Sequence, residues 1–271
     1  MPELPEVETV RRGLEPLVCG QRIEQVVRRV PKLRLPLDPK LQNKLGGQTI
    51  HGIARRAEYL LFQLDRGTLL LHPGMSGVLR LVDLDLPAEK HDHVDLCLDN
   101  GKLLRLTDPR RFGLLLYLKD DPLQYPLLAH LGPEPFDENL DADYLHTISR
   151  GRILAVKNFI MDQKVLVGVG NIYASEALFA AGIDPRRPAG KLTKVEADRL
   201  LEAIRAILLE AIAAGGTTLK DFRTSDGKPG YFQQQLQVYG RKGEGCPQCG
   251  RKIRQIVLGQ RSTYFCAKCQ K

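Results

Sequence analysis

The first residues of the chain combine an amine nucleophile with two carboxylates. Removal of Met1, which is usual when the second residue is small, would leave Pro2 as a secondary amine, followed by Glu3 and Glu6. An α-amino group titrates near pH 8, about two and a half units below a lysine, so a useful fraction is unprotonated at neutral pH. Such an amine can attack an electrophilic carbon and form an iminium while carboxylates move protons. A PELP start also suits simple helix entry, with Pro5 in the first turn.

Four cysteines near the end of the chain form two pairs with the pattern C-x2-C-x16-C-x2-C. This spacing is typical of two knuckles that close a tetrahedral zinc site, and four thiolates leave no open position for water. We therefore expect one structural Zn²⁺, with a rubredoxin-like iron site or two disulfides as alternatives. The ligands would be Cys246, Cys249, Cys266 and Cys269. The isolated Cys19 and Cys97 are expected to be small buried hydrophobic side chains.

Two motifs, HPGMSG and TDPRRFG, place side chains that suit base-stack intercalation on expected loop tips. Met75, Arg110 and Phe112 are a flexible apolar group, a planar cation and an aromatic ring. Such a set suits a wedge that fills a gap in a base stack, although each residue alone is compatible with ordinary packing or surface charge. Three histidines accompany the loops: His72, His91 and His93. The HDH segment could bind a metal, but strand alternation or phosphate contact is the simpler interpretation.

A third stretch, VGVGNIYASEALF, has the features of a phosphate site at a helix start. Gly168 and Gly170 permit a tight turn, and Asn171 is an N-cap candidate for the following helix. Outward-facing backbone N–H groups there would suit a phosphate, and Lys157, one short helix upstream, would supply a charge. Helical hairpins also simply pack, which is the alternative interpretation.

Charge and composition favour a nucleic-acid partner and a soluble class of protein. The formal net charge is +8, and from Lys228 onward nine Lys or Arg residues stand against one acid, Glu244. No apolar run reaches the length of a membrane span, and the N-terminus lacks the features of a secretory signal. We expect a cytoplasmic protein without membrane association.

These side chains need a strand-rich first half and a helical second half to position them. Apolar and β-branched runs predict strands at 22–30, 48–55, 59–64, 68–73, 93–98, 102–106 and 113–118, which favour a β-sandwich or barrel. A short N-terminal helix would bury Val7, Val10, Leu14 and Leu17. After residue 132 the pattern becomes helical, and a helix opening with the capping box Thr193-x-x-Glu196 would bury Val195, Leu200, Ile204, Ile207, Leu208 and Ala211. The polar segment 217–232 is too long for a mere connector.

Together, PELPEVETVRRGL, HPGMSG, KHDHVDL, TDPRRFG, GVGNIYASEALF, GGTTLKDF, LQVYGR and the four-cysteine module resemble the bacterial formamidopyrimidine-DNA glycosylases along essentially the whole chain. The resemblance implies an α+β fold in three parts. These are a catalytic β-sandwich with its helix over 1–130, a helix-two-turn-helix domain with a lesion-recognition loop over 131–232, and a zinc-finger β-hairpin over 233–271. It also implies a monomer that acts on double-stranded DNA containing oxidised bases or abasic sites.

In such a family member, 8-oxoguanine and formamidopyrimidines are excised and β- and δ-elimination follow. Pro2 would attack the anomeric carbon of the flipped nucleotide, Glu3 would shuttle protons with help from Glu6, and the TTLKDF segment would fold over the everted base. Met75, Arg110 and Phe112 would fill the vacated space, with Arg110 pairing with the orphan cytosine. Backbone phosphates would be held by His91, Arg110, Arg152, Lys157, Asn171 and Arg261, the last also serving δ-elimination, and His72 and Tyr239 would also bind DNA.

One position departs from the family pattern, since Glu58 stands in RRAEYL where the family has a lysine that assists lesion recognition and elimination. A carboxylate there reverses a charge beside the substrate phosphate, so we expect intact DNA binding with impaired processing of 8-oxoguanine. Two other classes remain open. One is the endonuclease VIII type, whose void-filling residues differ from Met75, Arg110 and Phe112; the other is a catalytically weakened damaged-DNA binder. A zinc-ribbon transcription or translation factor would give no reason for the PELPEVE start.

Overall fold

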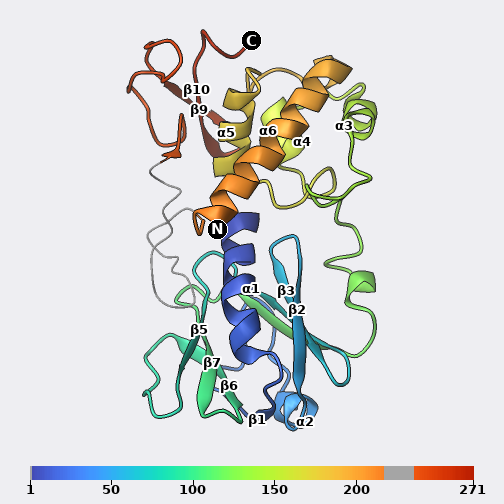
Figure 1. The fold of residues 1–271 in the computed structure, drawn as a ribbon, viewed down its shortest axis with the longest axis vertical. Coiled ribbons are helices and arrows are strands. Elements are labelled where there is room, and N and C mark those ends of the chain that lie inside the picture. The colour runs from blue at the N-terminus through green and yellow to red at the C-terminus, as the bar shows by residue number, and fades with distance from the viewer. Residues whose placement is uncertain (1, 217–234) are drawn as a thin grey trace. The chain divides into compact units, whose positions relative to one another are not determined.

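The computed structural model describes residues 2–216 and 235–271, which form two compact units (Figure 1). The first unit comprises the described residues up to Ala129 together with Gly215 and Gly216. The second runs from His130 to Ala214 and resumes in the described residues after 234, so the helical segment and the four-cysteine module belong to one unit. The predicted lesion-recognition segment, TTLKDF at 217–222, lies outside the described residues.

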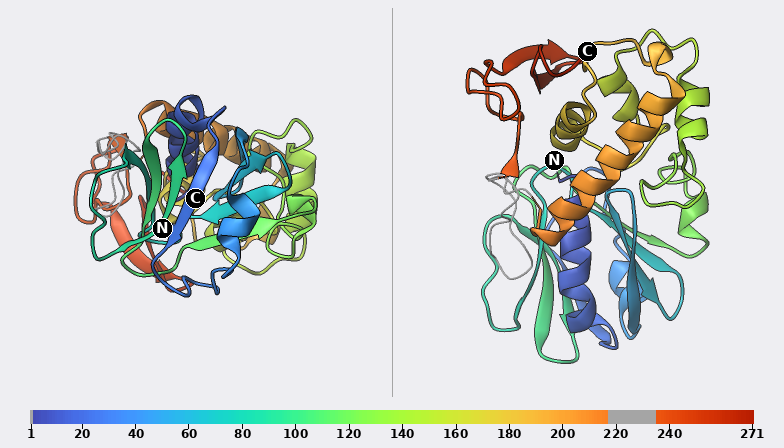
Figure 2. Two further views of the ribbon diagram at one scale, coloured as in Figure 1. Left: turned by 90° about the horizontal axis from the view of Figure 1, so that it is seen from below. Right: turned by 45° about the horizontal axis from the view of Figure 1, so that its top comes forward.

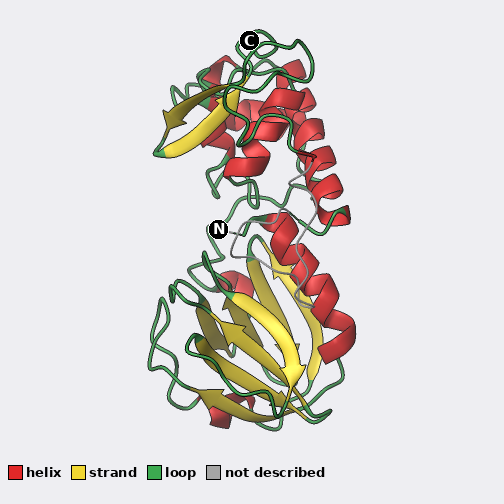
Figure 3. Ribbon diagram, turned by 90° about the vertical axis from the view of Figure 1, so that its left-hand side faces the viewer, coloured by secondary structure: helices red, strands yellow, loops and turns green. Residues whose placement is uncertain are grey.

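The first unit contains two four-stranded antiparallel sheets, with strand orders β1-β6-β7-β5 and β2-β3-β4-β8 (Figure 3). Their strands are β1 Ile23–Arg28, β2 Ile50–Arg56, β3 Tyr59–Leu64, β4 Thr68–His72, β5 Val78–Asp83, β6 Asp92–Leu98, β7 Lys102–Thr107 and β8 Leu114–Leu118. The remaining elements are helix α1 Leu4–Val18, helix α2 Leu41–Leu45 and the 3-10 turn η1 Pro122–Gln124.

Alternate residues of both sheets build one apolar core, as a sandwich requires. Leu60 and Phe62 of β3 are buried with Leu71 of β4 from one sheet, and with Val94 and Leu96 of β6 from the other. Helix α1 joins this core and lies against β2 and β3 (Figure 2). The predicted β-sandwich with an N-terminal helix is therefore confirmed.

Three details of the first unit differ from expectation. Leu17 is 47% exposed and Val18 is fully buried in its place, because the helix turns Val18 toward the core at its last position. Strand β5 was not predicted, since it is an edge strand with mostly half-buried side chains and therefore lacks a clear apolar alternation. Helix α2 has only five residues and no side-chain cap, which leaves little sequence evidence for it.

The second unit consists of helices followed by a β-hairpin. Its elements are α3 Ala142–Ser149, α4 Val156–Ile160, α5 Asn171–Ala180, η2 Ala189–Lys191, α6 Lys194–Ala213, β9 Arg254–Leu258 and β10 Arg261–Phe265. The predicted capping box opens α6: the Glu196 N–H donates to Thr193 Oγ1 at 3.2 Å and the Thr193 N–H donates to Glu196 Oε2 at 2.9 Å. Val195, expected in the core, is 73% exposed in the first turn of α6.

Candidate catalytic and DNA-binding sites

The start of α1 is held in a fixed geometry. Glu3 and Glu6 are 5% and 1% exposed, and Glu6 Oε2 accepts a 2.9 Å hydrogen bond from the Glu3 N–H. A Cβ on Gly216 would lie 3.2 Å from both Cγ and Oε1 of Glu6, so the chain returns to this turn at a residue without a side chain. Pro2, the predicted nucleophile, is buried at the head of the same turn.

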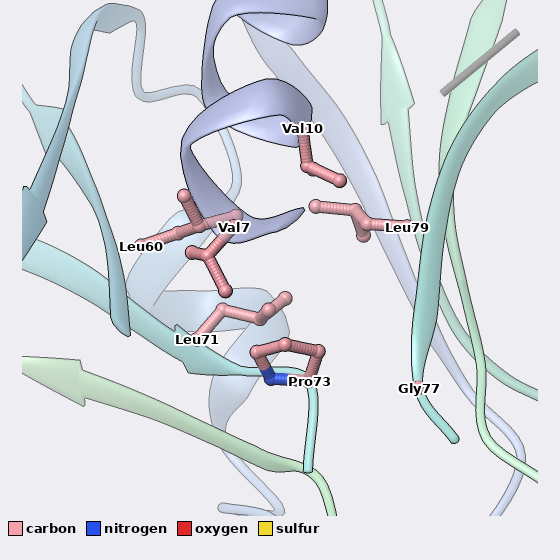
Figure 4. Close-up of a pocket in the computed structure, with 7 residues that line it drawn as sticks. All are labelled: Val7, Val10, Leu60, Leu71, Pro73, Gly77 and Leu79. Atoms are coloured by element: carbon pink, nitrogen blue, oxygen red, sulfur yellow. The ribbon is translucent and has the colours of Figure 1, made fainter. Parts of the chain in front are cut away.

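The first turn of α1 packs on the base of the HPGMSG loop around an apolar pocket. Val7 and Val10 of α1 face Leu60 and Leu71 of the second sheet, Leu79 of β5, and Pro73 and Gly77 of the loop (Figure 4). The helix that carries the predicted nucleophile and the loop that carries Met75 therefore share one apolar support.

Glu58 lies in a two-residue turn between β2 and β3, where Arg56 pairs with Tyr59. Its side chain is 3% exposed, and the preceding Ala57 has a φ of 51°, in the left-handed region. Burial raises the pKa of the neighbouring Tyr59 phenol, and Glu58 adds to that shift while Arg34 opposes it. The residue expected to depart from the family pattern is thus a buried carboxylate that acts electrostatically on Tyr59.

Helix α1 is connected to this turn through Glu8, a residue that the sequence did not single out. Arg55 Nε donates to Glu8 Oε2 at 3.1 Å, and Arg55 Nη1 donates to the Ala57 carbonyl at 2.9 Å. Burial alone would raise the pKa of Glu8, but hydrogen bonds from Arg11 and Arg12 outweigh it and hold the pKa below its usual value. In the sequence, Glu8 stands in a run of charged residues typical of a solvated surface. In the structure, its carboxylate fixes the Glu58 turn relative to α1.

The three predicted wedge residues lie exposed on neighbouring loops of this unit. Met75 and Phe112 are 36% and 45% exposed, which is unusual for side chains of their type. The Arg110 guanidinium stacks over the Phe112 ring, with its Cζ 4.7 Å from the ring centroid. The arrangement can present an apolar group, a ring and a planar cation together.

His72 is buried rather than presented to solvent. Its Nδ1 accepts a 2.9 Å hydrogen bond from the Gly74 N–H, and its ring packs on Tyr59 with centroids 4.7 Å apart. Burial, and secondarily Arg34, lowers its pKa to about 4, so the imidazole is neutral near pH 7. This geometry makes His72 a support for the HPGMSG loop and disfavours the expected direct contact with DNA.

His91, by contrast, is only half-buried, just before β6. Its ring lies 6.4 Å from that of His93, which is buried with Nε2 2.9 Å from the Asp108 carbonyl. His91 is therefore placed to reach a ligand, whereas His93 belongs to the fold.

Lys157 is at the centre of a hydrogen-bonded cluster in the second unit. Its side chain is 1% exposed, and Nζ donates to Asn171 Oδ1 at 2.6 Å, Thr263 Oγ1 at 2.8 Å and the Ser262 carbonyl at 3.2 Å. Asn171 Nδ2 donates in turn to the Ser262 carbonyl at 3.0 Å. The cluster joins α4 and α5 to β10, so the Lys157 ammonium is bound by groups of the fold itself.

Asn171 is not the N-cap that the sequence predicted. Gly170 occupies that position with an extended backbone, because the Asn171 side chain turns toward the hairpin instead of toward the helix N–H groups.

Glu176 is a second residue that the sequence did not indicate. Its buried carboxylate accepts hydrogen bonds from the N–H groups of Gln237, Val238 and Tyr239, at 2.8, 3.0 and 2.7 Å. Burial raises its pKa, while these hydrogen bonds pull the pKa the other way. Glu176 thereby holds Tyr239, whose ring packs on Tyr264 with centroids 5.1 Å apart.

The two remaining predicted phosphate ligands of this unit are exposed cations. Arg261 begins β10 directly after the turn at Gly259 and Gln260, whose φ angles of 52° and 61° are typical of a type I′ hairpin. Arg152 lies in the loop between α3 and α4, whose backbone is fixed by a 2.8 Å hydrogen bond from the Gly190 N–H to the Arg152 carbonyl. Both side chains are therefore free to approach a polyanion from a rigid backbone.

Among residues 2–216 and 235–271, the group of side chains arranged to bind a metal is the predicted set of four cysteines. Their Sγ atoms all lie within 4.8 Å of one another, with Cys246 to Cys269 at 3.9 Å and Cys249 to Cys266 at 3.5 Å. Zn–S bonds of about 2.3 Å in a tetrahedron place sulfurs roughly 3.8 Å apart, so the four thiolates fit one zinc ion.

The chain combines a β-sandwich that has a fixed N-terminal turn, a helical segment, and a four-cysteine hairpin that carries exposed cations. Together these features define a zinc-finger DNA-binding protein. Three family models match this chain: the formamidopyrimidine-DNA glycosylase N-terminal domain over residues 1–115, its H2TH domain over 131–223, and the zinc finger found in FPG and IleRS over 243–271. The chain therefore belongs to the formamidopyrimidine-DNA glycosylase family.

The similarity to individual relatives extends along the full length of the chain. The formamidopyrimidine-DNA glycosylases of Stutzerimonas stutzeri and Thioalkalivibrio sulfidiphilus are 59% and 57% identical, each covering 100% of both chains. Among solved structures, the MutM (Fpg) protein of Thermus thermophilus is 42% identical with a TM-score of 0.87, covering 99% of this chain and 98% of that one. The Lactococcus lactis Fpg in complex with DNA containing an abasic site is 37% identical with a TM-score of 0.92, covering 99% of both chains.

Proposed function

We propose that this protein is a base-excision-repair DNA glycosylase and abasic-site lyase that removes oxidised purines, chiefly 8-oxoguanine and formamidopyrimidines, from duplex DNA. The observation that carries the proposal is the α1 start, where Pro2 heads a turn fixed by the Glu6 carboxylate and seated on the Met75 loop. Full-length relatives named formamidopyrimidine-DNA glycosylase, and Lactococcus structures holding Fapy-dG or abasic DNA, support the same conclusion.

The proposed reaction starts with the unprotonated Pro2 amine. Its lone pair forms a bond to C1′ of the everted nucleotide while the glycosidic bond breaks and its electrons leave with the base, which is protonated as it departs. Glu3 shuttles protons as the sugar opens and the iminium forms. The Glu6 carboxylate keeps Glu3 in place by accepting a hydrogen bond from the Glu3 N–H. Loss of a C2′ proton then expels the 3′ phosphate, a second elimination expels the 5′ phosphate, and hydrolysis of the iminium frees Pro2.

Eversion is needed because C1′ is not accessible inside a stacked duplex. We assign the space left behind to Met75, Arg110 and Phe112. Exposed or half-buried groups then hold the backbone, and these are His91, Arg110, Arg152, Asn171, Tyr239 and Arg261. Lys157 orients Asn171 from below. We place these functions in a catalytic domain over 1–130, a helix-two-turn-helix domain over 131–232 and a zinc finger over 233–271.

Binding through several phosphates predicts a steep loss of affinity with salt, and a nucleoid-associated, cytoplasmic location. No described helix combines the length and the apolar character that crossing a membrane would require.

The second candidate function is damage-site binding with weakened chemistry, and the buried Glu58 carboxylate is the observation that favours it. The deciding experiment is single-turnover cleavage of a duplex carrying 8-oxoguanine opposite cytosine. An active glycosylase/lyase leaves a one-nucleoside gap with phosphate at both ends; binding without cleavage would establish the second candidate instead.

A further inference from the structure

Asp108 is a fully buried carboxylate that joins the two loops on which the wedge residues lie. Oδ1 accepts a 2.8 Å hydrogen bond from the hydroxyl of Ser76, in the HPGMSG loop. Oδ2 accepts a 2.7 Å hydrogen bond from the Gly113 N–H, in the TDPRRFG loop, and the Arg110 N–H approaches Oδ1 at 3.3 Å. Both carboxylate oxygens therefore accept hydrogen bonds, Oδ1 from the HPGMSG loop and Oδ2 from the TDPRRFG loop.

The backbones of the two loops also meet directly at this point. Gly74 has a φ of 70°, and a Cβ on it would lie 2.4 Å from the Phe112 carbonyl carbon and 2.6 Å from the Gly113 nitrogen. Such contacts exclude any side chain at position 74 and leave the loops no freedom to approach further. The Asp108 hydrogen bonds prevent the opposite movement, in which the loops would separate.

The main chain of Asp108 connects the same point to the segment of His91. The Asp108 N–H donates to the His91 carbonyl at 2.9 Å, and the Asp108 carbonyl lies 2.9 Å from His93 Nε2. The apolar pocket beneath the HPGMSG loop continues the connection to Val7 of α1. A shift at Asp108 would thus move Met75, Phe112 and His91 together.

We propose that Asp108 is a positioning residue that fixes the relative placement of Met75, Arg110 and Phe112, and so sets how efficiently the protein replaces an everted nucleotide. The inference rests on the proposed function. The Asp108 carboxylate accepts from a backbone N–H at each oxygen, from Arg110 at Oδ1 and from Gly113 at Oδ2, whereas a carboxamide of the same shape turns an NH2 group toward one of these N–H groups, which cannot accept. Because the groups are buried, that mismatch opens the clasp between the loops without removing any residue that would touch DNA.

The test compares Asp108→Asn with the wild type in two reactions. Excision of 8-oxoguanine from duplex DNA requires the wedge, whereas β-elimination at a preformed abasic site in a single strand does not, since no stack needs filling. We expect a loss of 10-fold or more in duplex excision, a reduced preference for cytosine over adenine opposite the lesion, and elimination within 2-fold of wild type. The fluorescence change of 2-aminopurine beside the lesion should fall in parallel, because it reports unstacking.

Two variants keep the test decisive if Asp108→Asn folds poorly. Ser76→Ala removes one bond of the clasp and should produce the same pattern more weakly, while Ser76→Thr, which keeps the hydroxyl, should restore activity. Asp65→Asn is the control for the chemical change itself, since Asp65 also accepts a backbone N–H, from Thr49 at 2.7 Å, but is exposed and lies in the β3–β4 connection of the other sheet. Equal losses in both reactions, or an unchanged opposite-base preference, would overturn the inference; an inactive wild type would overturn the proposed function instead.

Discussion

Nζ of Lys157 lies 2.6 Å from Oδ1 of Asn171, in a site where the lysine side chain is 1% exposed. A buried ammonium is expensive unless its donors are used, and here three acceptors from α5 and β10 use them. The pair therefore joins the start of α5, where a phosphate is expected, to the hairpin that carries Arg261.

Replacing Lys157 by Met should weaken both the fold and DNA binding. The variant leaves Asn171 Oδ1 and Thr263 Oγ1 without their donor, which costs about 2 kcal/mol in the free energy of unfolding. We expect DNA affinity to fall about 10-fold, because Asn171 loses its orientation. Chemical denaturation and fluorescence anisotropy measure the two effects, and Lys164→Met, at an exposed position of the same unit, should change neither.

Placing at position 58 the lysine that the resemblance to the family implies should raise activity. Glu58→Lys removes a buried carboxylate and replaces it with a cation that, by resemblance to the family, would assist elimination. Our hypothesis is that Glu58 favours the ammonium form of the nucleophile, and because one pKa unit corresponds to about tenfold in free amine near neutral pH, we expect a roughly 10-fold faster single-turnover excision of 8-oxoguanine. Glu24→Lys, an exposed reversal of the same charge, is the control for overall electrostatics. Unchanged, normal turnover in Glu58→Lys would contradict the assigned effect.

His72 makes stability depend on pH in a defined window. Its pKa is lowered to about 4 by burial in the fold, against a value near 6.5 for the exposed side chain. Between these values the unfolded state binds more protons, so stability is greatest above pH 6.5 and falls as the pH drops toward 4. The expected loss between pH 7 and pH 5 is about 2 kcal/mol. Urea unfolding at both pH values should show this slope reduced in His72→Gln and retained in His51→Gln; equal slopes in all three proteins would refute the account.

Zinc removal should abolish DNA binding while leaving most of the secondary structure. The thiolates close a small cluster with Phe179, Val238 and Ile253, and that cluster supports the hairpin carrying Arg261. The sandwich and α6 have their own cores, so far-UV circular dichroism should change little. Affinity that survives verified metal removal would show that the hairpin folds without zinc.

Much of this fold follows from local sequence patterns. The strands from β1 to β8, with the exception of β5, and the α6 capping box are predicted because apolar periodicity and turn residues act over a few positions. The four cysteines are equally local, since knuckle spacing nearly determines the site.

The supporting residues of the site escape such patterns. Glu8, Glu176 and Asp108 are ordinary acids in sequence, and their roles depend on partners 47, 61 to 63 and 32 residues away. His72 was expected to contact DNA, and local sequence gives no sign of its burial, which comes from tertiary packing against Tyr59. Long-range burial and hydrogen bonding, which local sequence does not encode, decide these cases.

The measurement that most directly tests the account is borohydride trapping on duplexes carrying either 8-oxoguanine opposite cytosine or a preformed abasic site, with the adduct mapped by mass spectrometry. The account predicts a covalent adduct at Pro2 with both duplexes, slower with 8-oxoguanine because of Glu58. Tight binding to both duplexes without any adduct, or an adduct at a residue other than Pro2, would contradict it.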